Sequence, residues 1–168
     1  ADAKKVQQDS VVSPIEMPMN DEIQQVNGVS KATNKETQRL SNKLADATKA
    51  MVKKNWKTIY VKAVPTGDKA AVRFYYVDTR GQVHNGQVIR NTGLSKGKYM
   101  TGSLRQAEAL QELVNHLERT GQEVPSSIDI IITQGGYRSK TIFNYDEDTS
   151  NLPAYQQQYE QQNFPTMK

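Results

Sequence analysis

The stretch Ser126-Ser-Ile-Asp-Ile-Ile-Ile-Thr-Gln-Gly-Gly-Tyr-Arg-Ser-Lys-Thr-Ile-Phe-Asn-Tyr-Asp146 decides the fold of this chain. Two alternating runs flank a Gly-Gly pair, and glycine readily adopts the positive φ that a two-residue hairpin turn requires. With Gly135 and Gly136 as the turn, the register of an antiparallel hairpin follows by counting outward. One face then carries three cross-strand pairs: Ile132 with Ser139, Ile130 with Thr141 and Ile128 with Phe143.

Two helices are expected before this hairpin. The first begins near Asn34, capped by Thr33 or Asn34, and ends at Asn55. The second begins at the capping box Ser103-Leu-Arg-Gln106 and ends at Gly121. Apolar residues recur at helical spacing in both, namely Leu40, Leu44, Ala47 and Met51 in the first and Leu110, Leu113, Val114 and Leu117 in the second.

Three strand-like segments lie between the two helices. Residues 56–64 alternate and stop at Pro65, because proline cannot continue a central strand. Residues 69–78 alternate in the same way and lead through a turn that ends at Gly81. The third segment covers residues 82–90, where Asn85-Gly86 favours a bulge or a second turn, and residues 93–102 are expected to form a loop.

These elements predict an α+β fold in the order α-β-β-β-α-β-β. About five strands form one antiparallel sheet, and two main helices pack on it. Residues 1–33 are interpreted as a flexible arm, residues 34–148 as a single domain and residues 149–168 as a tail. Within the tail, the spacing of Tyr155 and Tyr159 suits a short docked helix, with disorder as the alternative.

Composition limits the classes of protein. The 168 residues are 36% hydrophobic and include no cysteine, which excludes disulfides, thiolate zinc sites and cysteine nucleophiles. No apolar run approaches the roughly 18 residues of a membrane helix, so no membrane insertion is expected. The start Ala1-Asp2-Ala3 resembles an end left by signal peptidase, so we expect a periplasmic protein, with the cytoplasm as the alternative.

Charge is distributed unevenly along the chain. Residues 34–121 hold sixteen Lys/Arg and seven Asp/Glu, a surplus of nine positive charges, whereas the net charge of the whole chain is +4. Such a segment favours an acidic partner, which can be a protein, a nucleic acid or an anionic membrane surface. The alternative is a lysine-rich helix face that only contacts solvent.

The sequence offers no strong catalytic or metal-binding motif, and we expect neither an enzyme nor a cofactor. The two histidines, His84 and His116, are not at metal-ligand spacing and are interpreted as surface or interface residues. A pair of His84 with Asp78 would suit a small hydrolase, but no activated nucleophile lies nearby in the sequence. The run Asp146-Glu-Asp148 lacks the alternation and glycine of a calcium loop.

A nucleic-acid-binding module is the main alternative to a protein-binding role. Arg73, Tyr75 and Tyr76 on one strand, with lysines nearby, would make a platform on which bases stack. Tyrosine is also common in strands, and the chain has no aromatic signature of an RNA-recognition motif. The interpretation as core or partner-interface residues is therefore favoured.

Several segments together resemble the YezG-like family of antitoxin and immunity proteins from bacterial toxin systems. The segments are Trp56-Lys-Thr-Ile-Tyr-Val61, Val72-Arg-Phe-Tyr-Tyr76 and the closing strand Gly136-Tyr-Arg-Ser-Lys-Thr-Ile-Phe-Asn-Tyr-Asp146, which follows the second helix. The resemblance covers residues 35–148. The chain departs from the family pattern in its basic central half and in the absence of a tryptophan before the hairpin.

The resemblance implies a protein that binds a cognate toxin or secreted effector and protects the producer or its siblings in bacterial competition. The basic central segment then suggests a toxin with an acidic contact surface. Interfaces of this kind depend on a few aromatic or arginine anchors and on complementary charge. The candidate partner-binding residues are Arg73, Tyr75, Tyr76, Tyr137 and Arg138, with Asp146 and Asp148 as charge partners.

Overall fold

The computed structural model describes residues 15–16, 30–66, 69–136 and 139–167. The helices are α1 (Lys31–Lys49), α2 (Ile89–Thr92), α3 (Lys96–Arg119) and α4 (Leu152–Asn163). The strands are β1 (Ile15–Glu16), β2 (Trp56–Thr66), β3 (Lys69–Asp78), β4 (Val83–Asn85), β5 (Ser127–Thr133) and β6 (Lys140–Asn144). The arm expected over residues 1–33 lies outside the described residues except at 15–16 and 30–33.

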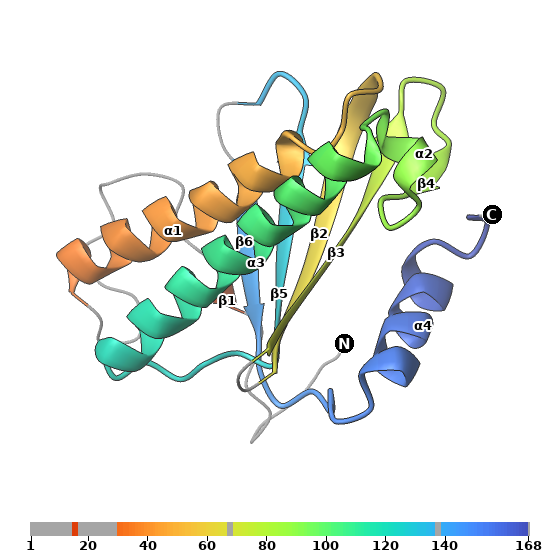
Figure 1. Ribbon diagram of the computed structural model, residues 1–168. Coiled ribbons are helices and arrows are strands. Elements are labelled where there is room, and N and C mark those ends of the chain that lie inside the picture. The colour runs from red at the N-terminus through yellow and green to blue at the C-terminus, as the bar shows by residue number, and fades with distance from the viewer. Residues whose placement is uncertain (1–14, 17–29, 67–68, 137–138, 168) are drawn as a thin grey trace.

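The strands form one antiparallel sheet in the order β1-β6-β5-β2-β3-β4. Helices α1 and α3 cover one face of this sheet, and α4 lies on the opposite side (Figure 1). The predicted α+β class is confirmed, and the two-residue β1 adds a sixth strand at the β6 edge. None of the described helices combines the length and apolar character needed to span a membrane.

The hairpin of β5 and β6 has the predicted register. Its turn differs by one position, because the Gly136 N–H donates to the Thr133 carbonyl at 3.0 Å, with Gly135 at a φ of +81°. The third predicted pair, Ile132 with Ser139, lies just beyond the last pair of the ladder. The two confirmed pairs are Ile130 with Thr141 and Ile128 with Phe143, and all four side chains are buried.

Helix α1 begins and ends earlier than predicted. Ser30 caps it, since the Ser30 hydroxyl accepts a hydrogen bond of 3.2 Å from the Thr33 N–H, which satisfies one of the helix's free amide groups. The helix stops at Lys49, not at Asn55. Beyond it, the Lys53 N–H donates to the Thr92 carbonyl at 2.8 Å and so directs the chain toward α2.

Helix α3 begins about two turns before the predicted capping box at Ser103, so the expected loop over residues 93–102 is wrong. Ser95 caps the helix by accepting from the Lys98 N–H at 3.3 Å. Gly102, which suggested a loop, lies inside the helix, and a side chain at this position would overlap the sulfur of Met51. The predicted end is confirmed, since Gly121 follows the helix at a φ of +72°.

Two of the predicted strands have different lengths. β2 continues through Pro65 to Thr66, because beyond Ala63 it pairs only with β3 and is an edge strand that tolerates proline. β4 ends at Asn85, and the chain then turns into α2 instead of continuing as a strand to residue 90. The turn is closed by the Asn85 side chain, which accepts from the Gln87 N–H at 2.8 Å.

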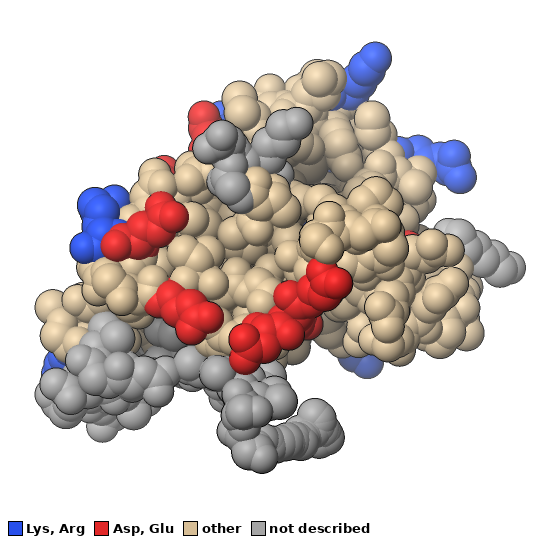
Figure 2. All heavy atoms as spheres, turned by 90° about the horizontal axis from the view of Figure 1, so that it is seen from below, with Lys and Arg blue, Asp and Glu red and all other residues tan. Residues whose placement is uncertain are grey.

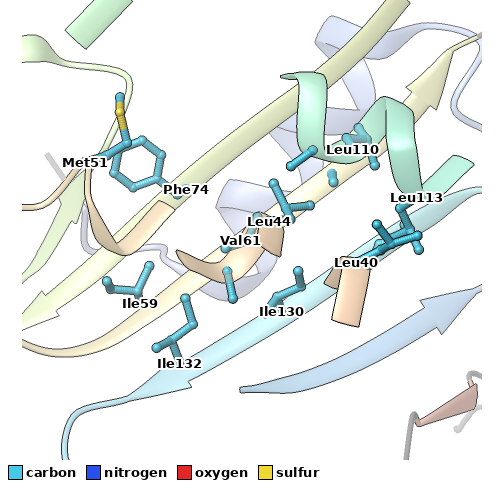
Figure 3. Packing of buried hydrophobic residues seen from close by; sticks show 14 of the residues in the cluster. Leu40, Leu44, Met51, Ile59, Val61, Phe74, Leu110, Leu113, Ile130 and Ile132 are labelled. Atoms are coloured by element: carbon cyan, nitrogen blue, oxygen red, sulfur yellow. The ribbon is translucent and has the colours of Figure 1, made fainter. Parts of the chain in front are cut away.

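The hydrophobic core lies between the sheet and the pair α1/α3 (Figure 3). Alternation along the strands brings every second side chain to this face, and the apolar stripes of the two helices pack against it. The residues of this core that Figure 3 labels are Leu40, Leu44, Met51, Ile59, Val61, Phe74, Leu110, Leu113, Ile130 and Ile132.

The contact between α1 and α3 also contains polar groups. His116 is buried there, so its interpretation as a surface or interface residue is wrong. Its Nε2 lies 2.8 Å from the Thr37 hydroxyl, and that hydroxyl donates to the Thr33 carbonyl at 3.0 Å, so the Nε2–H is the donor to Thr37. Burial lowers the pKa of His116 below its ordinary value, which favours the neutral ring.

Candidate partner-binding site

The outer face of the sheet carries the predicted anchor Tyr75, but α4 covers it (Figure 1). The Tyr75 side chain is 0% exposed and packs against the rings of Tyr159 and Phe164, at centroid distances of 5.7 and 4.9 Å. Its hydroxyl donates to the Glu160 carboxylate at 2.6 Å. Burial, together with the hydrogen bond to Glu160, raises the pKa of Tyr75, so the hydroxyl keeps its proton.

Arg73 lies beside Tyr75 on the same face and also contacts α4. Its Nη1 donates to the Gln156 side chain at 3.2 Å, and its Nη2 lies 3.5 Å from the Glu160 carboxylate. The structure therefore brings these two predicted anchors together. Their polar groups hold α4 on the sheet, so in this conformation neither presents a free anchor to a partner.

Tyr76 lies on the opposite face of the sheet, because successive side chains of a strand alternate. It is buried, its hydroxyl donates to the Asn91 carbonyl at 2.6 Å, and its ring stacks on His84 at 4.8 Å. Tyr75 and Tyr76 thus face away from each other and are both covered. They form no exposed platform on which nucleic-acid bases can stack.

Of the other predicted site residues, the structure describes Asp146 and Asp148, which follow β6. Tyr137 and Arg138 fall outside the described residues. Asp146 is exposed at the end of β6 with a φ of +64°, a left-handed conformation that aspartate tolerates in turns. Asp148 is exposed two residues later, and hydrogen bonds from the Ser150 hydroxyl and N–H lower the pKa of its carboxyl group.

A groove of about 560 Å³ runs between α4 and the outer face of β2, β5 and β6. Its floor includes Tyr60, Ile131 and Ile142 from the sheet, and acidic residues border it at Glu147 and Asp148. Among the predicted site residues that the structure describes, only Asp148 lines this groove.

Lys62 lies at the back of the groove and was not predicted as a site residue. It is 5% exposed, with its Nζ 3.0 Å from the Ser127 hydroxyl and 3.2 Å from the Asp129 carboxylate. The same Nζ lies over the rings of Tyr155 and Tyr159, at 5.5 and 5.0 Å from their centroids. Lys62 therefore joins α4 to β2 and β5.

The charge of Lys62 is retained despite its burial. Burial acts to lower the pKa of Lys62, but the Asp129 carboxylate, helped by Tyr155 and Glu147, outweighs it and holds that pKa above its ordinary value. Cross-strand pairing places Lys62 directly opposite Asp129. The sequence shows both residues, but it does not reveal that β2 pairs with β5. This pairing brings Lys62 and Asp129 together.

A second hollow, of about 550 Å³, lies at the other end of the sheet. It contains the predicted pair of His84 and Asp78, whose Nε2 and Oδ2 atoms are 2.7 Å apart. The hydrogen bond from His84 lowers the pKa of Asp78 to about 2, and backbone N–H groups of Gln82 and Arg80 act in the same direction. Such a carboxylate is a weak base, and no serine lines the hollow.

The cationic residues Lys54, Arg80 and Arg90 also line this second hollow. In the part of the chain that the structure describes, no group of three or more histidine and carboxylate side chains is arranged to hold a metal ion. Three cations and one carboxylate, that of Asp78, thus line the hollow.

Negatively charged side chains lie on a different part of the molecule. Acidic side chains cluster on the face seen in Figure 2, where the loops that follow α3 and β6 lie. The exposed acidic residues here are Glu118 in the last turn of α3, Glu123 in the loop after it, and Asp146, Glu147 and Asp148 after β6. The molecule thus has an acidic end and a cationic end.

Comparison with known proteins supplies the remaining evidence. The chain gives no match among curated proteins. A family model described as "Immunity protein YezG-like" matches residues 37–167. This range includes β2 to β6 and all of α4, and so extends beyond the 35–148 of the resemblance. The chain belongs to the YezG-like family of immunity proteins.

Proposed function

We propose that this protein neutralises a cognate bacterial toxin by binding it, and that the toxin presents an acidic contact surface. Membership of an immunity-protein family carries the proposal, because the members of such families generally act by binding and not by catalysis. The excess of nine positive charges over residues 34–121 supports the acidic contact surface.

The proposal includes a role in competition between bacteria, in which the toxin is a secreted effector. It also places the complex in the periplasm, with the cytoplasm as the alternative. Fractionation of source cells, followed by detection of the chain with a specific antibody, decides between the two compartments. Recovery of the chain with cytoplasmic markers alone would reject the periplasmic placement.

The test of binding is an affinity pull-down with the full chain from nuclease-treated lysate of the source organism, at near-physiological salt. We expect one stoichiometric protein partner whose toxicity is suppressed when the two chains are expressed together. Recovery of no specific protein, or of a partner whose toxicity is unchanged, would contradict the proposal.

A basic nucleic-acid-binding module is the second candidate, and the same positive charge favours it. Its binding would fall steeply with salt, because each phosphate contact releases counterions. Binding of a DNA or RNA duplex by the purified chain, in the absence of any protein partner, would favour this candidate. A hydrolase that uses His84 and Asp78 is the third, and it predicts an activity that Asp78→Asn abolishes without loss of the fold.

A further inference from the structure

The first turns of α3 expose two large apolar side chains next to each other. Met100 is 61% exposed and Leu104 is 59% exposed, and these are the large hydrophobic side chains exposed among the described residues. They are four residues apart, so they lie one turn apart on the same side of the helix. A single exposed apolar residue is ordinary, but an adjacent pair offers the apolar centre that protein interfaces contain.

Exposed cations lie near this pair, and one exposed carboxylate, Glu108, lies one turn beyond Leu104. Lys96, Lys98 and Arg105 are exposed on the same turns of α3. The sequence contains no Asp or Glu from residue 79 to residue 107. Two exposed cations elsewhere on α1 are paired, Arg39 with Glu36 at 2.8 Å and Lys43 with Glu112 at 2.7 Å.

The same surface continues into the cation-lined hollow beside β3 and β4. The Lys53 N–H donates to the Thr92 carbonyl, and Gly93 lies against the side chains of Lys53 and Lys54. The Tyr99 hydroxyl donates to the Gly86 carbonyl at 2.9 Å, which fixes the start of α3 to the turn after β4. The loop after α1, α2 and the first turns of α3 therefore lie next to one another.

We call this surface the cationic end. Its members are Lys53, Lys54, Arg80, Arg90, Lys96, Lys98, Met100, Leu104 and Arg105.

We propose that the cationic end is the surface on which the toxin docks, through an acidic patch with an apolar centre that covers Met100 and Leu104. This inference rests on the proposed function and names the contact surface that the function requires. Complementary charge would speed the encounter, and the apolar pair would be desolvated at the centre of the interface. A nucleic-acid backbone would use the cations but not the apolar pair, so a protein fits the surface better.

The predicted anchors on the outer face are consistent with this assignment. Arg73 and Tyr75 are occupied by α4, and the groove beside α4 is bordered by Glu147 and Asp148. An acidic toxin surface would be repelled by that border and attracted to the cationic end.

The test compares two variants of the full chain with equal changes in charge on the same helix. Leu104→Asp with Arg105→Glu alters the cationic end. Asn115→Asp with Arg119→Glu alters exposed positions near the other end of α3. All four side chains are exposed, so both variants should fold, which circular dichroism and thermal unfolding verify.

Each protein is used as bait in the pull-down, and the partner recovered by the wild-type chain is purified for titration calorimetry. We expect the first variant to lose affinity by roughly tenfold or more and the control variant to stay within about twofold of wild type. Equal affinity of both variants for a toxin that the wild-type chain neutralises would overturn the assignment of the surface but not the function.

The other outcomes also decide whether the surface assignment or the proposed function fails. If the wild-type chain binds an acidic protein that is not toxic, and the first variant alone loses it, the surface stands and the proposed function fails. If the wild-type chain recovers no protein, both fail. Binding of a 20-base-pair DNA duplex that the first variant loses, with no protein partner, would overturn the inference in favour of nucleic acid.

Discussion

Lys62 is the residue on which the outer face of the sheet depends. A buried ammonium group is costly unless it is paired, and here a carboxylate, a hydroxyl and two tyrosine rings surround it. Because the rings belong to α4 and the other groups to β5, one side chain couples the tail to the central domain.

Replacement of Lys62 by methionine should loosen α4. Methionine keeps most of the side-chain volume but leaves Asp129 without its cationic partner, so we expect a loss of about 1–3 kcal/mol in the free energy of unfolding. Urea denaturation measures the loss, and hydrogen exchange should show faster exchange in α4. Lys57→Met, at an exposed position of the same strand, is the control; an equal effect of both variants would contradict this role of Lys62.

Asp78 gives a prediction about the stability of the fold at low pH. Its pKa of about 2 in the folded chain is below its ordinary value of 3.8, so its contacts stabilise the fold above pH 4 and are lost as the pH falls toward 2. An NMR titration of the Asp78 carboxyl group should give a midpoint near 2. A midpoint near 4 would show that the hydrogen bonds from His84 and the backbone do not hold it.

At the scale of elements, α4 is attached mainly by side chains that reach from its surface to the sheet. Phe164, just after the helix, is its buried anchor and contacts the rings of Tyr60, Tyr75 and Tyr159 at 4.9 to 5.9 Å. The Tyr159 ring also packs on Tyr75 at 5.7 Å, and Arg73, Tyr75 and Lys62 add polar contacts to α4. An element held in this way can detach while the core remains folded.

Phe164→Ala should therefore release α4 and leave the α1/α3 core intact. We expect a loss of about 2–4 kcal/mol in the free energy of docking, because the ring is removed from an aromatic cluster. Hydrogen exchange should show unprotected amides over residues 152–163 and unchanged protection in β2 and β5. Gln161→Ala, on the exposed side of the helix, is the matched control; wild-type protection of α4 in Phe164→Ala would contradict this account.

The turn after β4 makes a prediction about packing. A side chain at Gly86 would overlap the buried ring of Phe74, so Gly86→Ala should destabilise the chain by about 1–3 kcal/mol. Gly97→Ala meets open space in α3 and should instead stabilise the chain by up to about 1 kcal/mol. Thermal unfolding compares the two; a similar melting temperature for both variants would show that Gly86 is not constrained.

The elements also show what the sequence could predict. The register of β5 and β6 follows from alternation and a glycine turn, which are local signals, and it is confirmed. The start of α3 was missed because Gly97 and Gly102 resemble loop residues, and the sequence does not reveal that Met51 occupies the space where a side chain of residue 102 would lie. Pro65 was read as a stop because the sequence does not reveal that β2 lacks a second neighbour there.

At the scale of the whole molecule, the candidate site was harder to predict than the fold. Arg73 and Tyr75 were predicted as anchors for a partner, and they are covered by α4, which follows them by some 80 positions in the chain. The positive charge of residues 34–121 was visible in the sequence. Only the structure, which shows where α2 and α3 lie, reveals that part of this positive charge is close to Met100 and Leu104.

The charge asymmetry of the whole molecule sets the orientation of a partner. An acidic toxin would approach the cationic end and avoid the acidic face of Figure 2. Its association rate should therefore fall as salt rises, while the apolar contacts at the centre should keep the dissociation rate nearly constant. Surface plasmon resonance at several salt concentrations separates the two rates; an association rate that does not change with salt would argue against an electrostatic approach.

The central claim is that this chain protects cells by binding a toxin. Its most direct test is the growth of bacteria that express the partner recovered by the pull-down, with and without this chain directed to the same compartment. We predict that the partner alone stops growth and that the wild-type chain restores it in proportion to the amount of complex formed. Growth that stays arrested although the complex forms would contradict the claim.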